Sequence, residues 1–182
     1  MIKLFTDRLL IRDYIIEDIG EYYELFSDKI VMYYLQDICE NNIEEARKNL
    51  MDIINDQIYE KRKYFVFRIE DKDSNELIGA MGYTVLNYTP YGKFAHMGYL
   101  LKQNCWNKGY ATEALKRVLE FAFEENNVYR IHTGCFKENS HSERVMQKCG
   151  FIKEAEFKEY EYHDGKIKDR VEYRILKNEW KK

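Results

Sequence analysis

The stretch GYLLKQNCWNKGYATEA, residues 98–114, decides the fold. An apolar strand pattern ends at Leu101, a short polar turn follows, and a helical pattern opens at Gly109. The first amides of a helix lack intrahelical partners and the helix dipole adds positive potential there, so a helix start favours anions. A glycine lets the backbone approach a phosphate closely at such a start. A second helix start follows in NSHSERVMQKCGF, residues 139–151.

Length and composition limit the class of protein. The 182 residues, with 45% hydrophobic and 34% charged residues, predict one globular domain over residues 1–182. No apolar run approaches the ~20 residues of a membrane-spanning helix, and no signal-peptide pattern opens the chain, so we expect a cytoplasmic protein without a membrane partner. A net charge of −3 argues against nucleic-acid binding and agrees with a cationic substrate.

The four cysteines are Cys39, Cys105, Cys135 and Cys149. They form no CxxC pair and have no histidines at metal-ligand spacing, which argues against a zinc site and against a disulfide framework.

Hydrophobic periodicity gives the order of elements. It predicts strands over residues 4–12, 64–70, 77–86, 94–101 and 129–136, followed by a C-terminal hairpin. It predicts two short helices within residues 13–35, then helices from Asn42, over 109–125 and over 140–149. Residues 87–93, which hold the only proline, are expected to form a loop. The Asp164-Gly165 pair predicts a type I′ turn in the final hairpin.

Three segments resemble a known family. FTDRLLIR (residues 5–12) is similar to the opening-strand motif TxRLxLR, and WNKGYATEA (106–114) is similar to the motif WGKGYATEA. NSHSERVMQKCGF (139–151) is similar to NxxSxxVxxKxGF. These motifs belong to the Rim-type branch of the GNAT superfamily, typified by the ribosomal-protein N-terminal acetyltransferases. The matches fall in order along nearly the whole chain, which makes them far more specific than a lone glycine turn.

The resemblance implies an α/β (α+β) fold in which a mixed central sheet of about seven strands has helices on both sides. The order of the elements predicted along the chain is β-α-α-β-β-β-α-β-α-β-β, and a strand, crossover helix and strand around Gly109 should pair in parallel. The resemblance also implies two central strands that splay apart to admit the pantetheine arm of coenzyme A. The co-substrate is then acetyl-CoA, with no metal, and a homodimer is the family-level expectation.

The resemblance assigns a cofactor-binding role to thirteen residues. They are Tyr99, Leu100, Leu101, Trp106, Asn107, Lys108, Gly109, Tyr110, Ala111, Thr112, Asn139, Ser142 and Arg144. Amides of the turn 107–112 would hold the pyrophosphate, the strand backbone before it would pair with the pantetheine arm, and an amide near Leu100 would hold the thioester oxygen as it becomes charged. Each of these binding roles has a structural alternative. The turn 107–112 could be an ordinary strand-to-helix turn, and the strand before it a plain core strand. Asn139 could be only a helix N-cap, and Arg144 only a solvated charge.

Ser142 is the first candidate for handling the leaving sulfur, because the matching serine in Rim-type enzymes lies beside the cofactor thiol. Many other GNAT members use a tyrosine four residues further on, where this chain has Met146. Ser140 and Glu143 fit a capping box, which indicates a structural role for Ser140.

A base must accept the proton of the attacking ammonium. Glu161 stands where Rim-type enzymes have the assigned glutamate, and strand alternation puts it on the face of Ala155 and Phe157, where partial desolvation would raise its pKa. The alternatives are that Glu161 is an exposed hairpin residue, or that a bulge turns it to the other face. His96, on the strand that enters the cofactor site, is the second candidate base.

The sequence therefore predicts an N-acetyltransferase that moves the acetyl group of acetyl-CoA to a primary amine by direct attack in a ternary complex. The acceptor is a small-molecule amine or a protein N-terminus, which the fold alone does not distinguish. The alternative is a non-catalytic CoA-binding sensor or scaffold of the same fold.

Overall fold

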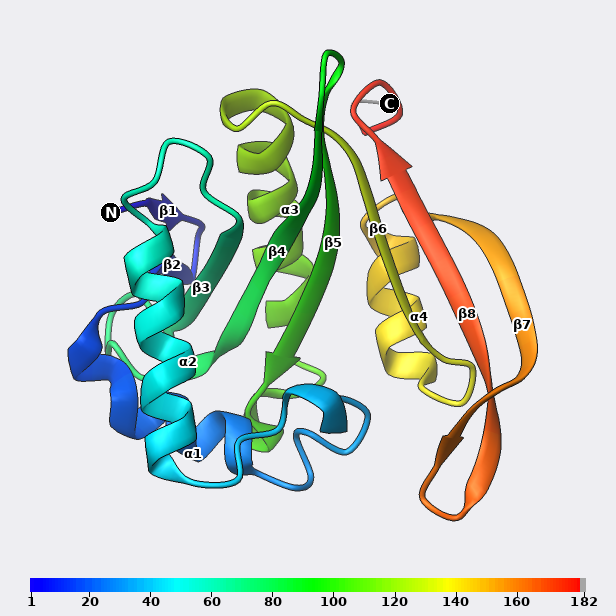
Figure 1. The fold of residues 1–182 in the computed structure, drawn as a ribbon, viewed down its shortest axis with the longest axis horizontal. Helices are drawn as coiled ribbons and strands as arrows, with labels where there is room; N and C mark the ends of the chain where they lie inside the picture. Colours follow the sequence, from blue (N-terminus) through cyan, green and yellow to red (C-terminus); the bar gives the residue numbers. More distant parts are fainter. Residues whose placement is uncertain (181–182) are drawn as a thin grey trace.

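Eight strands form one mixed sheet in the computed structural model, which describes residues 1–180 (Figure 1). The strands are β1 (Lys3–Phe5), β2 (Leu9–Asp13), β3 (Tyr64–Asp71), β4 (Leu77–Thr89), β5 (Gly92–Leu101), β6 (Val128–Phe136), β7 (Ile152–His163) and β8 (Lys166–Leu176). Their order across the sheet is β1-β2-β3-β4-β5-β6-β8-β7. Among the strand pairs of the described residues only β5–β6 is parallel, as expected for strands joined through a helix.

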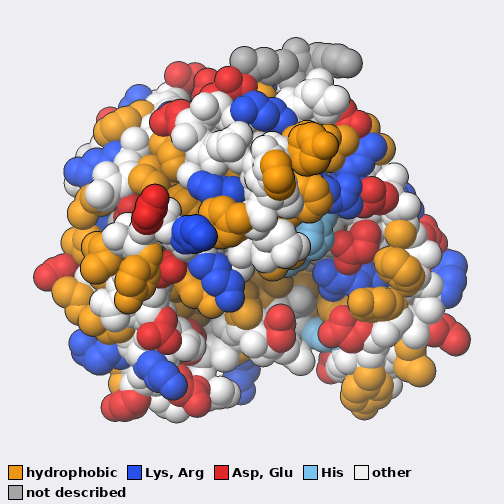
Figure 2. Space-filling view, turned by 45° about the horizontal axis from the view of Figure 1, so that its top comes forward, with side chains coloured by type: hydrophobic (Ala, Val, Ile, Leu, Met, Phe, Trp, Pro, Cys, Tyr) orange, Lys and Arg blue, Asp and Glu red, His pale blue; other side chains and the backbone are white. Residues whose placement is uncertain are grey.

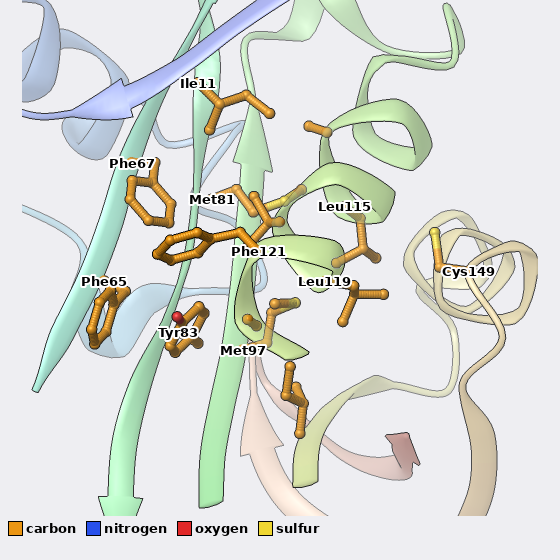
Figure 3. Close-up of a cluster of buried hydrophobic side chains, with 14 of the residues drawn as sticks. Ile11, Phe65, Phe67, Met81, Tyr83, Met97, Leu115, Leu119, Phe121 and Cys149 are labelled. Carbon is orange, nitrogen blue, oxygen red and sulfur yellow. The ribbon is translucent and has the colours of Figure 1, made fainter. Parts of the chain in front are cut away.

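Helices cover both faces of the sheet, as predicted (Figure 1). The helices are α1 (Ile19–Ser27), α2 (Ile43–Asp56), α3 (Tyr110–Glu120) and α4 (Ser140–Lys148). On one face, α1 and α2 pack on a cluster that includes Ala80 and Leu100. On the other face, α3 and α4 cover the larger core shown in Figure 3, where Leu115 and Leu119 of α3 lie over the sheet. None of the helices within residues 1–180 has the length and apolar character needed to cross a bilayer.

The sheet has one strand more than the seven expected, and the extra strand comes from the N-terminal segment. Residues 4–12, expected as one strand, form the β1–β2 hairpin instead, with Leu4 opposite Ile11. The Thr6 amide donates to the Leu9 carbonyl at 3.0 Å, and the Leu9 amide donates to Thr6 Oγ1 at 2.9 Å. Because the side chain and backbone of Thr6 close a turn here, the polar residues at 6–8 interrupt the strand pattern.

Two other expected elements are wrong. Residues 87–93 are mostly strand, because β4 runs to Thr89 and β5 begins at Gly92, where φ is +127°. Of the two helices expected within residues 13–35, one is α1, preceded by a 3₁₀ turn (Ile16–Asp18). The other is absent from the described chain: residues 28–35 form turns and lead to a second 3₁₀ turn, Gln36–Ile38.

Helix termini differ in detail from the expected ones. Residues 109–125 divide into α3 and a π-helical turn, Phe121–Glu125. The N-cap of α4 is Asn139, whose Oδ1 accepts from the Ser142 amide at 3.2 Å, so the capping box predicted from Ser140 and Glu143 is wrong. The Asp164-Gly165 turn has φ values of +48° and +77°, which fits the predicted type I′ geometry.

The two central strands part at a fork. The parallel β5–β6 pairing ends at His96 and His132, although β5 continues to Leu101 and β6 to Phe136 (Figure 1). The splay implied by the family resemblance is therefore present. It opens toward the N-termini of α3 and α4, which begin shortly after β5 and β6 end.

Candidate functional site

The helix start after β5 has the geometry of an anion cradle. Asn107 and Gly109 have φ values of +60° and +83°, and α3 begins at the next residue. The Glu113 amide donates to the Gly109 carbonyl at 3.0 Å, so the amides of Tyr110, Ala111 and Thr112 precede the helical hydrogen-bond ladder. These donors, with the positive end of α3, suit a phosphate group.

The strand before the turn is firmly held. Trp106 Nε1–H donates to the Leu101 carbonyl at 2.8 Å, and the side chains of Leu100 and Leu101 are buried in the core. Trp106 therefore ties the turn to the end of β5. Both leucine side chains belong to the core, which leaves only the backbone of these residues for a ligand.

A latch of three residues fastens this turn to the N-terminal hairpin. Thr6 Oγ1 donates to Glu113 Oε1 at 2.6 Å, and Arg8 Nε donates to Glu113 Oε2 at 2.7 Å. Arg8 Nη1 also donates to the Lys108 carbonyl at 3.0 Å, and its guanidinium lies 4.4 Å from the centroid of the Tyr110 ring. Sequence reasoning missed this latch, although its residues fall within two of the quoted motifs. The contacts join residues at least 100 positions apart in the sequence.

The charge of Glu113 depends on this latch. Burial alone would raise the pKa of its carboxyl, but the hydrogen bonds from Thr6 and Arg8 outweigh burial and hold that pKa below its ordinary value of 4.5. A carboxylate with a lowered folded pKa stabilises the protein above its unfolded pKa, and this contribution is lost as the pH falls through the folded pKa.

We expect Glu113→Gln to lower the free energy of unfolding at pH 7 by about 1–2 kcal/mol, because Thr6 and Arg8 lose a charged acceptor and Arg8 is half exposed. The difference from the wild-type protein should shrink as the pH falls below 4.5. Urea denaturation at several pH values measures both effects. Glu120→Gln is the matched control on α3, because Glu120 is more than half exposed and its one ion pair within residues 1–180 is with Arg117, one turn away. This substitution should lower the free energy of unfolding by less than about 0.5 kcal/mol. Equal losses in the two variants would contradict the latch.

Three polar side chains converge on the α4 side of the fork. The hydroxyls of Tyr99 on β5 and Ser142 on α4 lie 2.8 Å apart, and Tyr99 also donates to the Ser142 carbonyl at 3.0 Å. The Cys135 thiol on β6 donates to the Asn139 carbonyl at 3.8 Å, close enough to Ser142 for the serine hydroxyl to affect the pKa of the thiol. Burial raises the pKa of Tyr99 well above its usual range and raises that of Cys135 to about 11, so both stay protonated at neutral pH. When Tyr99 donates to both oxygen atoms of Ser142, the hydroxyl hydrogen of Ser142 stays free to donate to a ligand on this side of the fork.

The opposite side of the fork is open to solvent and carries histidines. His96 and His132 face each other with ring centroids 5.0 Å apart. Partial burial, and for His96 the neighbouring His132, lowers the pKa of both imidazoles, so both are neutral at pH 7. Beside them lies a cavity of about 380 Å³ lined by residues that include Phe94, Arg130 and Phe157. Figure 2 shows histidine side chains inside the hollow between the main body and the lobe on its right.

Glu161 lies on this open face but away from the fork. The register shifts between β7 and β8 in this region. Phe157 pairs with Arg170 and Glu161 pairs with Lys168, so β7 advances by four residues while β8 advances by two. The two extra residues form a bulge in which Glu159 has a φ of +50°. An even number of extra residues keeps the alternation, so Glu161 stays on the face of Phe157, as predicted. Its side chain is 51% exposed, so the expected desolvation is absent.

The remaining predicted residues lie at the surface near the two helix starts. Asn107, Lys108 and Arg144 are exposed, and Asn139 is half-buried, with its side chain in use as the α4 cap. Met146, at the position of the tyrosine of other GNAT members, is fully buried in the core. The described part of the chain holds no group of three or more His, Cys, Asp or Glu side chains arranged to bind a metal ion.

Comparison with known proteins agrees with this geometry. The model of the acetyltransferase (GNAT) domain family matches residues 8–152. The uncharacterized N-acetyltransferase YnaD of Bacillus subtilis is 34% identical over 176 residues, which are 96% of this chain and 97% of that protein. The [ribosomal protein uS5]-alanine N-acetyltransferase of Escherichia coli is 25% identical over 126 residues, 68% of this chain and 63% of that protein, which supports the resemblance to the Rim-type branch.

Solved structures share the fold over nearly the whole chain. A GNAT-family acetyltransferase from Bacillus anthracis has a TM-score of 0.80 at 29% identity, covering 98% of this chain and all of that one. The spermidine N-acetyltransferase of Vibrio cholerae, solved with CoA and spermine, has a TM-score of 0.82 at 22% identity, covering 96% and 99% of the two chains. The forked mixed sheet, the glycine-led start of α3 and these matches lead to one conclusion: this chain belongs to the GNAT family of acetyltransferases and is an acyltransferase.

Proposed function

We propose that this protein transfers the acetyl group of acetyl-CoA to a primary amine by direct attack in a ternary complex. The observation that carries the proposal is the division of the fork into two sides. Hydroxyl donors lie on the α4 side, at Tyr99 and Ser142, and neutral imidazoles lie on the open side, at His96 and His132. Acyl transfer needs this separation, because the nucleophile and the leaving group occupy different positions around the carbonyl carbon.

The residues present fit coenzyme A. The left-handed backbone at Gly109 opens a cradle whose amides, at residues 107–112, would hold the pyrophosphate. Backbone groups of β5 from Tyr99 to Leu101 lie past the end of the β5–β6 pairing and would hold the pantetheine arm, with Asn139 and Arg144 on α4 as further polar contacts. Bound acetyl-CoA would supply the activated acetyl group as a thioester.

Different residues of the chain would stabilise the carbonyl oxygen, stabilise the leaving thiolate and accept the proton of the amine. An amide near Leu100 would stabilise negative charge on the carbonyl oxygen, a contribution typically worth ~3 kcal/mol. The Ser142 hydroxyl, held by Tyr99, would stabilise the departing thiolate. An amine with a pKa of ~8 to ~10 arrives largely protonated, so a base must take its proton. His96, neutral and beside the fork, and Glu161, further along the same face, are the two candidates.

The acceptor is a small amine or a peptide N-terminus. Relatives and structural neighbours include enzymes named for each, spermidine in one case and a ribosomal protein alanine in another. The open face beside the fork is compatible with both. A CoA-binding sensor or scaffold without turnover is the alternative from outside the enzyme class.

The test combines binding and turnover. Calorimetric titration with acetyl-CoA should give saturable 1:1 binding, and thiol release should follow when spermidine or a peptide that begins with alanine is added. Binding without thiol release from any amine, together with unchanged behaviour of Ser142→Ala and His96→Gln, would favour the sensor. Absence of acetyl-CoA binding in folded protein would contradict both functions.

A further inference from the structure

Glycines flank the fork on its open face. Gly98 on β5 and Gly134 on β6 each lie two residues past the His96–His132 pair. A Cβ added at Gly98 would meet no heavy atom within 4 Å, whereas one added at Gly134 would lie 2.4 Å from Glu172 Oε1. The carboxylate of Glu172 therefore fills the space above Gly134, at the edge of the fork.

The sheet register explains this position. Glu172 on β8 is directly opposite Gly134 on β6, and directly opposed residues point to the same face. The Glu172 side chain also lines the cavity of about 380 Å³ beside the histidines. Its charge acts on the rings of His96 and His132, as does that of Arg170 on His96.

The carboxylate is held in place and keeps acceptor capacity. Arg170 Nε donates to Glu172 Oε1 at 2.6 Å, and the Glu172 side chain is 24% exposed. Within residues 1–180 no donor is bound to Oε2, and an ionised carboxylate has about four lone-pair sites. Glu172 therefore has room for a hydrogen-bonded cation from solution.

We infer that Glu172 binds the ammonium group of the acceptor amine and sets it over the fork on the side opposite Ser142, an inference that rests on the proposed function. An ammonium donates up to three hydrogen bonds, and a charged pair of this kind is stronger and shorter than a neutral one. The apolar walls of the cavity, Leu86, Phe94 and Phe157, suit the carbon chain that follows the amine. The substrate class is a primary alkylammonium or a peptide α-ammonium.

Glu172 is better placed for this role than Glu161. Glu161 pairs in register with Lys168, four residues from Glu172 along β8, which corresponds to roughly 13 Å. Both carboxylates face the same side, and Arg170 lies between them, 4.0 Å from Glu161. The arrangement puts Glu172 at the fork and Glu161 toward the hairpin.

Steady-state kinetics of Glu172→Gln with spermidine and with an alanine-initiated peptide tests the inference. For the acceptor that the wild-type enzyme uses, KM should rise at least 10-fold, while KM for acetyl-CoA stays within twofold. Glu156→Gln is the matched control, because Glu156 on the neighbouring strand β7 has the same 24% side-chain exposure. Glu156 lies opposite Val171, whose side chain is in the core, so Glu156 is on the other face of the sheet from Glu172. An acceptor KM within twofold of wild type in Glu172→Gln would overturn the inference.

Gly134→Ala gives a second, independent variant. Its Cβ would displace the carboxylate of an intact Glu172, so the acceptor KM should rise again. In a Glu172→Ala background, Gly134→Ala should raise the acceptor KM little further, so the effects of the two substitutions on the acceptor KM should be non-additive. Strict additivity would count against the inference.

Calorimetric titration of spermidine and the peptide into wild type and Glu172→Gln separates this inference from the proposed function. Amine binding that depends on Glu172, without thiol release, would support the site and contradict the reaction. Thiol release with equal amine binding in both proteins would support the reaction and overturn the site.

Discussion

Replacing Gly109 by valine is expected to raise the dissociation constant of acetyl-CoA at least 100-fold in a protein that still folds. Gly109 has a φ of +83°, a conformation that costs a β-branched residue about 1–3 kcal/mol. The strain is relieved by moving the turn, which shifts the amides at the start of α3 away from the positions that suit phosphate. Loss of one or two charge-assisted hydrogen bonds, each worth about 1.5–3 kcal/mol, accounts for a change of about 2.7 kcal/mol.

The control for Gly109→Val is Gly165→Val. Gly165 has a similar φ of +77° in the β7–β8 turn, and an added Cβ there would meet nothing within 4 Å. Both variants carry comparable backbone strain, so their melting temperatures should fall by similar amounts. Only the Gly109 variant should lose affinity in calorimetric titration with acetyl-CoA. Wild-type affinity in Gly109→Val would show that the α3 start does not bind the phosphates.

The parts of the site that sequence predicts are those set by local pattern. An apolar run, a polar turn and Gly109 specify a strand, a turn and a helix start within 17 residues, and the structure has all three. The α4 start also follows from a local pattern, although the N-cap is Asn139 and not Ser140. Local signals fix where a helix begins more reliably than which of two adjacent capping residues it uses.

The parts that sequence does not reveal depend on register between distant strands. Glu172 lies over Gly134 only because β6 pairs with β8 in one register, and nothing near Glu172 in the chain indicates a site. Glu161 keeps its predicted face because the β7 bulge adds an even number of residues, two; a one-residue bulge would have reversed it. The Thr6–Arg8–Glu113 latch likewise needs the β1–β2 turn to meet α3 in space.

Ser142→Ala is expected to lower kcat about 100-fold while the dissociation constant of acetyl-CoA changes less than threefold. Ser142 forms its hydrogen bond with Tyr99 at the α4 side of the fork, where the proposed reaction develops negative charge on sulfur. A donor aimed at developing charge acts mainly in the transition state, so its loss appears in kcat, and a 100-fold fall corresponds to about 2.7 kcal/mol. Ser140→Ala, the same substitution at an exposed residue of the same helical turn, should keep kcat within twofold.

Tyr99→Phe separates the positioning role of Tyr99 from hydrogen-bond donation by Ser142. Without the tyrosine hydroxyl, Ser142 loses a partner 2.8 Å away but keeps its own hydroxyl, so we expect a smaller fall in kcat, about 10-fold. Burial keeps the pKa of Tyr99 far above neutrality, so this loss should be the same at pH 7 and pH 9. The double variant should have a kcat close to that of Ser142→Ala alone, because both substitutions act on one hydroxyl pair. If kcat of Ser142→Ala stayed within threefold of wild type, the thiolate would be stabilised by another group.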